Sequence, residues 1–354
     1  MRGAYRRMMR PRAFDVSAGA WIASTLAPSA DRDRSGMQMQ RVFLSQKLIA
    51  TMMVAALSAA APAASVSLPD EAETQIVPGF ADFLVVDGES VWATNRGRVE
   101  RWSRQGKQAE VAMTRPCGGM AVAEGSLWVA DCKDGTLNRI DLQTAKLIVA
   151  IPTGIANPRG ETNVVAGAGS IWIPNDADRT IQRIDPSGNR VVASIPVAAG
   201  TYYLAFGFGS LWAVSSDNQL LQQIDPATNA VVKRIALGKQ PGFLAAGEGA
   251  VWVQEQGDGT LARIDPQTGE VSGRVKVGAD LLYGDIDAGG GAVWLRTTAD
   301  QTFAMIDPKS LAIVGRLGPA TGSGALRFAG AGVWTTAHDV HTLSWWSLAP
   351  KPKG

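Results

Sequence analysis

Cysteine and histidine are scarce in this chain of 354 residues, which contains two of each. Two cysteines exclude a disulfide-rich scaffold and a thiolate cluster. The two histidines, His338 and His341, both lie near the C-terminus, so a metal site built from several histidines is not expected. A nucleophile elbow, an HExxH motif, a P-loop and a CxxC pair are also lacking. With 46% hydrophobic and 19% charged residues the chain is not disordered, and the sequence therefore predicts a folded protein with few marks of chemistry.

Residues 1–63 read as a leader. Arg41 and Lys47 precede the apolar run 48–61, and Ala61-Pro62-Ala63 offers an A-x-A cleavage site. The run is too short to span a bilayer. We expect a signal peptide cleaved near Ala63, preceded by an over-long start, and a periplasmic or secreted mature protein without a membrane span. A buried core helix is the alternative for the apolar run, and a twin-arginine signal is the alternative leader type.

The basic character of the chain resides in this leader. Nine of the 34 Lys and Arg residues and three of the 32 Asp and Glu residues lie in it, so the remainder carries 25 basic and 29 acidic groups, a net charge of −4. The chain after the leader is mildly acidic and lacks a row of basic side chains that could bind the phosphate groups of a nucleic acid. Nucleic acid is therefore not an expected partner.

A repeat of about 40 residues organises the rest of the chain. Seven tryptophans share one short context, at spacings of 36, 44, 40, 40, 42 and 40 residues. In five units an Ile-Asp pair follows, with its Asp 13 residues after the Trp. The repeated residues are Trp92, Trp128, Trp172, Trp212, Trp252, Trp294 and Trp334, with Asp141, Asp185, Asp225, Asp265 and Asp307. Seven copies of one ring cannot all touch one ligand, so we interpret them as packing between units.

Each unit reads as four strands. In the unit 243–278 we expect strands at 243–246, 251–253, 261–264 and 271–277, with the turn Asp265–Gly269 between the last two. Four-stranded units of this length are propeller blades. The fold class predicted is an all-β, seven-bladed β-propeller of four-stranded antiparallel blades, forming one domain over 64–350 with a tail at 351–354. An open β-solenoid is the alternative.

The two ends of the repeat complement one another. The seventh unit supplies three strands, near 325–329, around Trp334 and at 342–348, and then the chain stops. The segment 73–77 has the character of the missing outer strand. We expect it to pair there and close the ring, which leaves no bare sheet edge.

The two cysteines lie in one predicted hairpin. Its turn is at Glu124-Gly125, so cross-strand partners sum to 249, as Cys117 and Cys132 do. We expect a disulfide between them, formed in an oxidising compartment. The alternative, a reactive or metal-binding pair, needs further soft ligands that the sequence lacks.

Functional residues are expected where the inter-blade loops and the loops between second and third strands surround the channel. The position three residues after the Trp is polar in six of seven units, namely Asn95, Asp131, Asn175, Ser215, Glu255 and Thr297. Such oxygens suit a hard cation, although they also suit the capping of strand ends. The inter-blade loops carry aromatic and charged candidates for ligand binding: Phe80, Arg159, Glu161, Tyr202, Tyr203, Phe243, Tyr283 and Asp285. This mixture suits a carbohydrate, a peptide or an amphipathic small molecule.

The units, for example 169–175 followed by 183–186, resemble the streptogramin (virginiamycin B) lyase-like and YncE-like seven-bladed propellers of bacteria. The resemblance covers about residues 73–348. It implies a channel-face histidine as general acid and base, and Mg²⁺ held by acidic residues, for opening a cyclic ester by elimination. On this resemblance Val251–Glu255 matches the blade motif that ends in Glu, so Glu255 is a metal ligand. His338, four residues after Trp334, is the candidate catalytic residue, because no histidine precedes it.

Three functions follow as hypotheses. The first is a periplasmic binding or scaffold protein, expected to be monomeric, that presents its loops to a small molecule, a peptide or a periplasmic protein. The second is a metal-assisted lyase or lactonase-type hydrolase with Glu255, Asp131, Asn175 and His338 around Mg²⁺ or Ca²⁺. The third is an accessory protein of periplasmic redox metabolism, which rests on analogy alone. No cofactor is required by the sequence.

Overall fold

The computed structural model describes residues 71–155, 161–281, 284–296, 303–317 and 323–348. The chain divides into two units, Met1–Ala61 and Pro62–Gly354. The predicted leader, residues 1–63, lies outside the described residues. Within the part of the chain described, no helix is long and apolar enough to cross a membrane.

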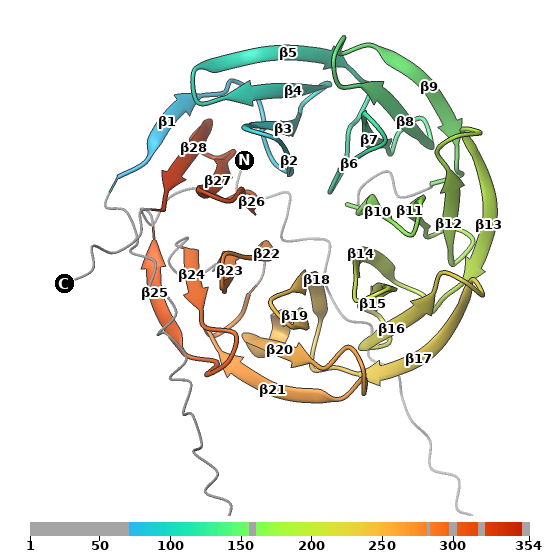
Figure 1. Cartoon of the computed structure of the whole chain (residues 1–354), viewed down its shortest axis with the longest axis vertical. Coiled ribbons are helices and arrows are strands. Elements are labelled where there is room, and N and C mark those ends of the chain that lie inside the picture. The colour runs from blue at the N-terminus through green and yellow to red at the C-terminus, as the bar shows by residue number, and fades with distance from the viewer. Residues whose placement is uncertain (1–70, 156–160, 282–283, 297–302, 318–322, 349–354) are drawn as a thin grey trace, which may run out of the picture. The chain divides into compact units, whose positions relative to one another are not determined.

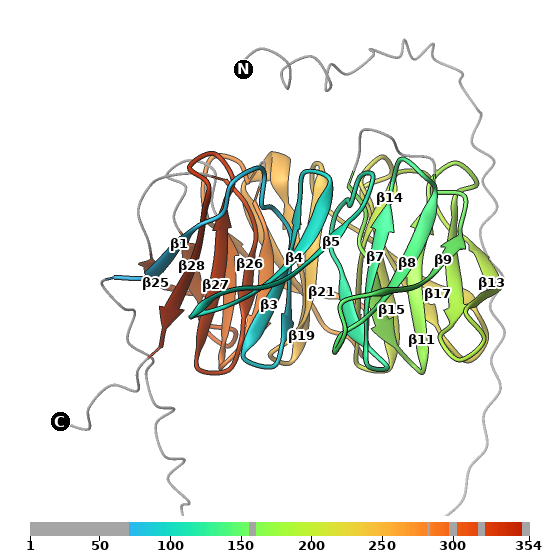
Figure 2. The ribbon, with the colours of Figure 1, turned by 90° about the horizontal axis from the view of Figure 1, so that it is seen from above.

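The second unit is a ring of seven antiparallel sheets, each with four strands (Figures 1 and 2). This confirms the predicted seven-bladed β-propeller. Blade one consists of β2 (Leu84–Asp87), β3 (Ser90–Asn95), β4 (Arg98–Ser103) and β5 (Gly106–Ala112). Blade two consists of β6 (Ala121–Ala123), β7 (Ser126–Asp131), β8 (Thr136–Asp141) and β9 (Leu147–Pro152). Blade three consists of β10 (Val165–Gly167), β11 (Ser170–Asn175), β12 (Thr180–Asp185) and β13 (Arg190–Pro196).

The other blades repeat this order. Blade four consists of β14 (Thr201–Gly207), β15 (Ser210–Ser215), β16 (Leu220–Asp225) and β17 (Ala230–Ala236). Blade five consists of β18 (Pro241–Gly247), β19 (Ala250–Glu255), β20 (Thr260–Ile264) and β21 (Val271–Lys276), with the short 3₁₀ turn η2 (Gln256–Asp258) after β19. Blade six consists of β22 (Ile286–Gly289), β23 (Ala292–Arg296), β24 (Phe303–Ile306) and β25 (Ile313–Leu317).

Blade seven combines the two ends of the described chain. Its strand order is β1 (Glu73–Ile76), β28 (Thr342–Ser347), β27 (Gly332–Ala337) and β26 (Leu326–Phe328). The antiparallel register pairs Glu73 with Trp345 and Ile76 with Thr342. In Figure 1 the N-terminal strand β1 accordingly lies beside the C-terminal strand β28 on the circumference. The first strands β2, β6, β10, β14, β18, β22 and β26 surround the central channel, and the fourth strands form the outside.

The seven repeated tryptophans are buried between blades, as predicted. Each is at most 1% exposed, on the second strand of its blade. In blades two to six the indole Nε1 donates to the backbone carbonyl five residues earlier, for example Trp172 to Gly167 at 2.9 Å. These rings therefore bury apolar surface between blades without leaving that donor unpaired.

The turns between third and fourth strands have the predicted chemistry. The Asp265 carboxylate accepts from the backbone N–H groups of Gln267 and Thr268, at 2.7 and 3.0 Å. Those amides lower the pKa of Asp265, with that of Thr268 contributing most. Gly269 closes the turn at a φ of +69°, which explains why the sequence has glycine there.

The predicted disulfide between Cys117 and Cys132 is confirmed, with the two Cα atoms 6.0 Å apart. One detail differs from the sequence arithmetic. Partners sum to 249 from Ala121 to Ala123, but Pro116 bridges Asp131, so the pairing has shifted by two residues at the start of this blade. The cysteines are therefore diagonal neighbours, within disulfide reach.

Candidate functional site

Side chains from different blades meet around the channel, on the face where the inter-blade loops enter the first strands. We call this region the channel mouth and define it by Asp82, Phe83, Glu161, Tyr203, Phe243, Asp285, Arg296 and His338. Counting back from each repeated Trp explains why they gather. Phe83, Tyr203, Phe243 and Asp285 all lie nine residues before a Trp, and thus occupy one position in four blades.

Aromatic rings cross the channel at the mouth. The ring centroids of Tyr203 and Phe243, from neighbouring blades, are 4.3 Å apart, and Phe83 of blade one lies 6.1 Å from Phe243 of blade five. Phe83 and Phe243 are 6% and 7% exposed. Blades one and five are not adjacent, so this contact spans the ring (Figure 1). The rings give the mouth an apolar floor.

Glu161 is the carboxyl group most perturbed by the mouth. Burial raises its pKa to about 8, and the charges of Asp82 and Asp285 act in the same direction. The Tyr203 hydroxyl, 3.5 Å from its Oε2, and Arg115 oppose the rise. Burial and Glu161 in turn raise the pKa of Tyr203 well above the ordinary value. At neutral pH this carboxyl is therefore mostly protonated, and it serves as a donor as well as an acceptor.

Asp285 ties blade six to blade seven. Its Oδ2 accepts from the Leu326 backbone N–H at 3.1 Å and from the Arg327 guanidinium at 2.6 Å. Arg296 lies beside it, 2% exposed, and donates to the Thr336 carbonyl at 2.7 Å. Burial lowers the pKa of Arg296 to about 10, although Asp285 and Asp82 favour its charge. Both ions are thus positioned by buried contacts.

His338 is held by four neighbours. Its ring stacks on Phe80 with centroids 3.9 Å apart, and its Nε2 lies 2.7 Å from the Ser323 hydroxyl and 3.1 Å from Asp339 Oδ1. Its Nδ1 lies 3.5 Å from Asp82 Oδ1. The imidazole is thus stacked and flanked by two carboxylates, and its Nδ1 is buried without a hydrogen bond among the described residues.

The three predicted metal ligands bond the loop that enters their blade or residues near their own strand end. Asp131 accepts from four backbone N–H groups, those of Thr114, Arg115, Lys133 and Asp134, at 2.9 to 3.2 Å. Asn175 donates to the Thr153 carbonyl at 2.9 Å. Glu255 accepts from Gly238, Thr260 and Arg274.

Glu255 shows how these contacts bear on metal binding. Although burial alone would raise its pKa, the bonds from Arg274, Thr260 and Gly238 lower it. Among the residues described, no three His, Cys, Asp or Glu side chains are grouped to hold a metal ion. Carboxylate oxygens already bonded to loop amides and a guanidinium do not fit a cation site, so no chemical step is derived through one.

The other predicted ligand residues divide into two groups. Glu161, Tyr203, Phe243 and Asp285 come together, and Tyr202 is half-buried, with burial and the charges of Asp176 and Asp217 raising its pKa. Arg159 and Tyr283 lie outside the described residues. The prediction missed Asp82, Phe83 and Arg296. Aligning the units on Trp would have found Arg296, because the position two residues after the Trp is uncharged in the other six.

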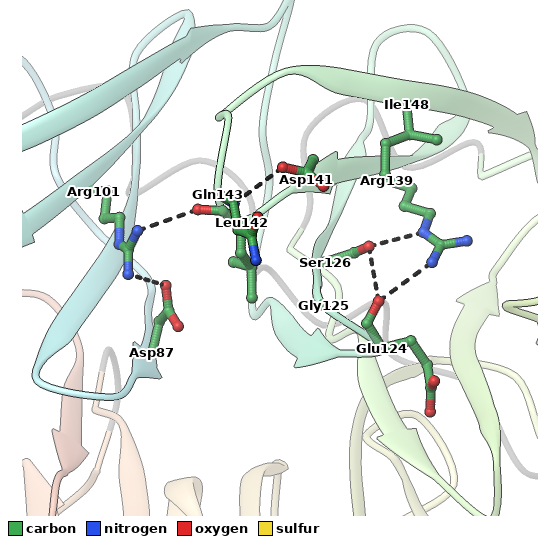
Figure 3. Close-up of a pocket in the computed structure, with 10 residues that line it drawn as sticks. All are labelled: Asp87, Arg101, Glu124, Gly125, Ser126, Arg139, Asp141, Leu142, Gln143 and Ile148. Carbon is green, nitrogen blue, oxygen red and sulfur yellow. Dashed lines mark hydrogen bonds and ion pairs between the residues drawn. The ribbon is translucent and has the colours of Figure 1, made fainter.

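A hollow lies elsewhere, between blades one and two, beside the turns Glu124–Gly125 and Asp141–Gln143 of blade two. It has a volume of about 510 Å³. Figure 3 shows the partners of its two arginines: Arg101 binds Asp87 at 2.8 Å and donates to the Leu142 carbonyl, and Arg139 donates to Ser126 Oγ at 2.8 Å. The bond from Arg101 to the Leu142 carbonyl joins blades one and two, and the other two contacts each lie within one blade, so we assign the hollow a structural role.

No family model and no curated protein matches the chain. Several solved structures are similar to the chain. A streptogramin B lyase has a TM-score of 0.67 at 15% identity, over 79% of this chain and 97% of the lyase. A catalytically inactive histidine-to-alanine variant of virginiamycin B lyase from Staphylococcus aureus, with quinupristin, has a TM-score of 0.65 at 14% identity. The match covers 80% of this chain and 99% of that variant. BamB from Moraxella catarrhalis has a TM-score of 0.57 at 15% identity, over 77% of this chain and 85% of BamB. The resemblance to the streptogramin lyase-like propellers is thus confirmed for the fold.

Proposed function

We propose that this protein is a periplasmic or secreted binding propeller that takes an amphipathic ligand, a peptide or a small molecule, at its channel mouth. One observation carries the proposal. Glu161, Tyr203, Phe243, Asp285 and His338 come from five different blades, and the contact of the Tyr203 and Phe243 rings near groups that donate and accept hydrogen bonds supports a ligand site. A mainly apolar surface with a few convergent polar groups is the usual form of a ligand site.

The compartment is part of the same proposal. The disulfide between Cys117 and Cys132 favours an oxidising environment. The predicted signal peptide would deliver the chain there.

Tyr202 offers the sharpest test of ligand binding. It is half-buried next to Tyr203 in β14, and its removal leaves the floor formed by Tyr203 and Phe243 in place. Periplasmic extract passed over the immobilised protein should yield a ligand or partner that Tyr202→Ala loses. Phe208→Ala is the matched control, because Phe208 is an exposed aromatic on the turn between β14 and β15. Equal capture by both variants and the parent protein would refute a site at the mouth.

A second candidate function is a lyase or a lactone hydrolase. The observation that favours it is His338, because stacking and carboxylate contacts hold its imidazole on the mouth. The comparison adds that one propeller of this fold is a lyase inactivated by replacing a histidine. In such a reaction His338 would take a proton from the substrate while Asp82 and Asp339 stabilise the imidazolium.

Two measurements decide this candidate. Turnover of a streptogramin-type cyclic ester should fall at least about a hundredfold in His338→Ala if the imidazole is the general base. Because Gly238, Thr260 and Arg274 already bond the Glu255 oxygens, millimolar Mg²⁺ or Ca²⁺ should not raise the Tm through this residue, and a rise that Glu255→Gln abolishes would show that a metal binds there. Turnover that is absent from the parent protein, or unchanged in His338→Ala, refutes the catalytic role.

A further inference from the structure

A serine lies against His338 at the channel mouth. Ser323 Oγ is 2.7 Å from His338 Nε2, and the His338 backbone N–H donates to the Ser323 carbonyl at 2.9 Å. Because both the side chains and the backbones of these two residues are joined, the pair keeps one geometry without a ligand. Neither ligand binding nor elimination requires this serine.

The pair occupies a contact that the propeller repeats. In blades four and five a comparable backbone bond runs from Ser216 to the Gly200 carbonyl and from Gln256 to the Gln240 carbonyl. The position eleven residues before the repeated Trp is serine only in blade seven, and the position four residues after the Trp is histidine only there. The fold therefore supplies the close approach, and blade seven alone combines these two residue types on it.

An aspartate of blade one lies at the other nitrogen of the imidazole. His338 Nδ1 is buried without a hydrogen bond among the described residues, and Asp82 Oδ1 lies 3.5 Å from it. A carboxylate only accepts, so Asp82 favours the proton on Nδ1 and leaves the Nε2 lone pair for the Ser323 hydroxyl. Such a contact is often long in an unliganded site and shortens when substrate binds.

Backbone bonds fix the place of Asp82. Its N–H donates to the Thr94 carbonyl at 2.9 Å, and its carbonyl accepts from Thr336 Oγ1 at 2.6 Å. Thr336 is fully buried on β27, the strand that ends one residue before His338. The serine, the histidine and the aspartate thus meet at the junction of blades one and seven, in the order of a nucleophilic triad.

Asp339 competes for the same groups. Its Oδ1 lies 3.1 Å from His338 Nε2, and its Oδ2 accepts from the Ser323 hydroxyl at 3.1 Å. The Asp339 side chain is 57% exposed, so water can replace it at either contact, whereas His338 Nδ1 is buried. Ser323 has one proton to donate, and the imidazole at 2.7 Å is the nearer acceptor.

Donors for a developing oxyanion lie next to the serine. The N–H of Gly324, a buried residue, bonds no acceptor within the described part of the chain. The N–H after a nucleophile is a usual oxyanion donor. Arg296 Nη1 donates to the Thr336 carbonyl at 2.7 Å, and a Cβ on Gly324 would lie 2.5 Å from the same oxygen. A guanidinium and this N–H group therefore approach one carbonyl from two sides of the site.

We propose that Ser323 is the nucleophile of an esterase at the channel mouth, with His338 as its general base and Asp82 as the carboxylate that orients the imidazole. The substrate is a neutral carboxylic ester or lactone, because Asp82 and Asp339 repel an anion and the aromatic rings of the mouth offer a surface to an apolar part. The proposal rests on the lactone-hydrolase candidate for the mouth and adds its nucleophile.

The reaction is hydrolysis through an acyl-serine. The Ser323 oxygen bonds the carbonyl carbon while its proton passes to His338 Nε2 and the carbonyl π pair moves onto oxygen. The bond to the alcohol oxygen then breaks, and the alcohol leaves with the proton from Nε2. Water attacks the acyl-serine and gives a proton to Nε2, the acid is released, and Ser323 recovers its proton.

Covalent labelling of the folded protein tests the nucleophile. A fluorophosphonate ester should add once per chain with loss of fluoride, and peptide mass spectrometry should place the adduct on Ser323. Ser187→Ala is the matched control, because Ser187 is an exposed serine on a turn of blade three. This variant should take the label as the parent protein does. Labelling of the parent protein does not depend on how any variant folds.

Kinetics test the roles of the three residues. The kcat/KM for p-nitrophenyl butyrate should fall at least about a hundredfold in Ser323→Ala and in His338→Ala, and about tenfold or more in Asp82→Asn. No adduct on the parent protein, an adduct on another residue, or turnover that survives in Ser323→Ala would overturn the proposal. Ligand capture that Tyr202→Ala loses is measured separately, so binding at the mouth can persist where labelling fails.

Discussion

Glu161 shows at the scale of one residue how the channel mouth alters chemistry. Burial, together with Asp82 and Asp285, raises its pKa to about 8 from an ordinary 4.5. A carboxyl with a raised folded pKa gives full stability below the unfolded value, and loses it as the pH rises from 4.5 to 8, because only the unfolded state releases its proton over that range. The mouth is therefore held together best when Glu161 is neutral.

Replacing Glu161 with glutamine should remove this penalty. We expect Glu161→Gln to match the parent chain at pH 4 and to exceed it by about 1–3 kcal/mol in free energy of unfolding above pH 8. Denaturant unfolding at intervals from pH 4 to 9 measures the difference, with the exposed Glu270→Gln as control. A difference that does not grow with pH would show that the carboxyl is not perturbed.

At the scale of elements, an arginine on the third strand links each of several blades to the next. Arg183 of β12 lies 4.8 Å from the Trp172 ring centroid and donates to the Pro226 carbonyl at 2.6 Å and to Asn229 Oδ1 at 2.8 Å, both in blade four. Arg139 repeats these bonds toward Pro186 and Asn189 of blade three. The arginine thus connects the repeated Trp of its own blade to the turn between the third and fourth strands of the next blade.

The linking bonds predict an unequal cost of truncation. Arg183→Ala should lose about 2–4 kcal/mol of stability, because a charged hydrogen bond and a cation–π contact both disappear. Gln223 occupies the same position in blade four. Within the described residues its side chain bonds Ser210 of its own blade and makes no bond to the next blade, so Gln223→Ala should lose less than about 1.5 kcal/mol. Chemical denaturation of both variants decides the matter, and equal losses would contradict a linking role.

The sequence predicted the elements far better than the site, for a physical reason. The repeated Trp, the Asp-Pro turns and the alternation of apolar and polar residues are local features of one blade. They recur in successive blades, so each copy supports the same prediction. The mouth depends on where seven first strands converge, so Glu161 and Tyr203 were predicted as neighbours of a ligand, whereas the contact of Phe83 with Phe243 was not. Asp131 and Asn175 are polar for local reasons, as loop and strand-end partners, which spacing alone does not distinguish from metal ligation.

At the scale of the whole molecule, the two ends of the described chain pair in blade seven. Thr74 Oγ lies 2.9 Å from Ser344 Oγ, and the Val77 N–H donates to the His341 carbonyl at 2.8 Å. Val77 is fully buried in the cluster that also holds Trp102 and Trp345, from blades one and seven. Without β1, the backbone groups of β28 that face it would lie bare at a sheet edge.

We therefore expect that a chain beginning at residue 79 loses about 3 kcal/mol or more of stability, or unfolds over a broader transition, relative to one beginning at residue 64. A synthetic peptide of residues 71–78 should bind the shortened chain and restore its Tm, because the pairing Glu73 with Trp345 through Ile76 with Thr342 can form between two molecules. The same peptide with Val77→Asp is the control, since a buried charge opposes docking. Calorimetry with and without peptide measures both effects. A shortened chain as stable as the longer one would mean that the ring is held by its seven inter-blade contacts alone and that β1 is an accessory strand.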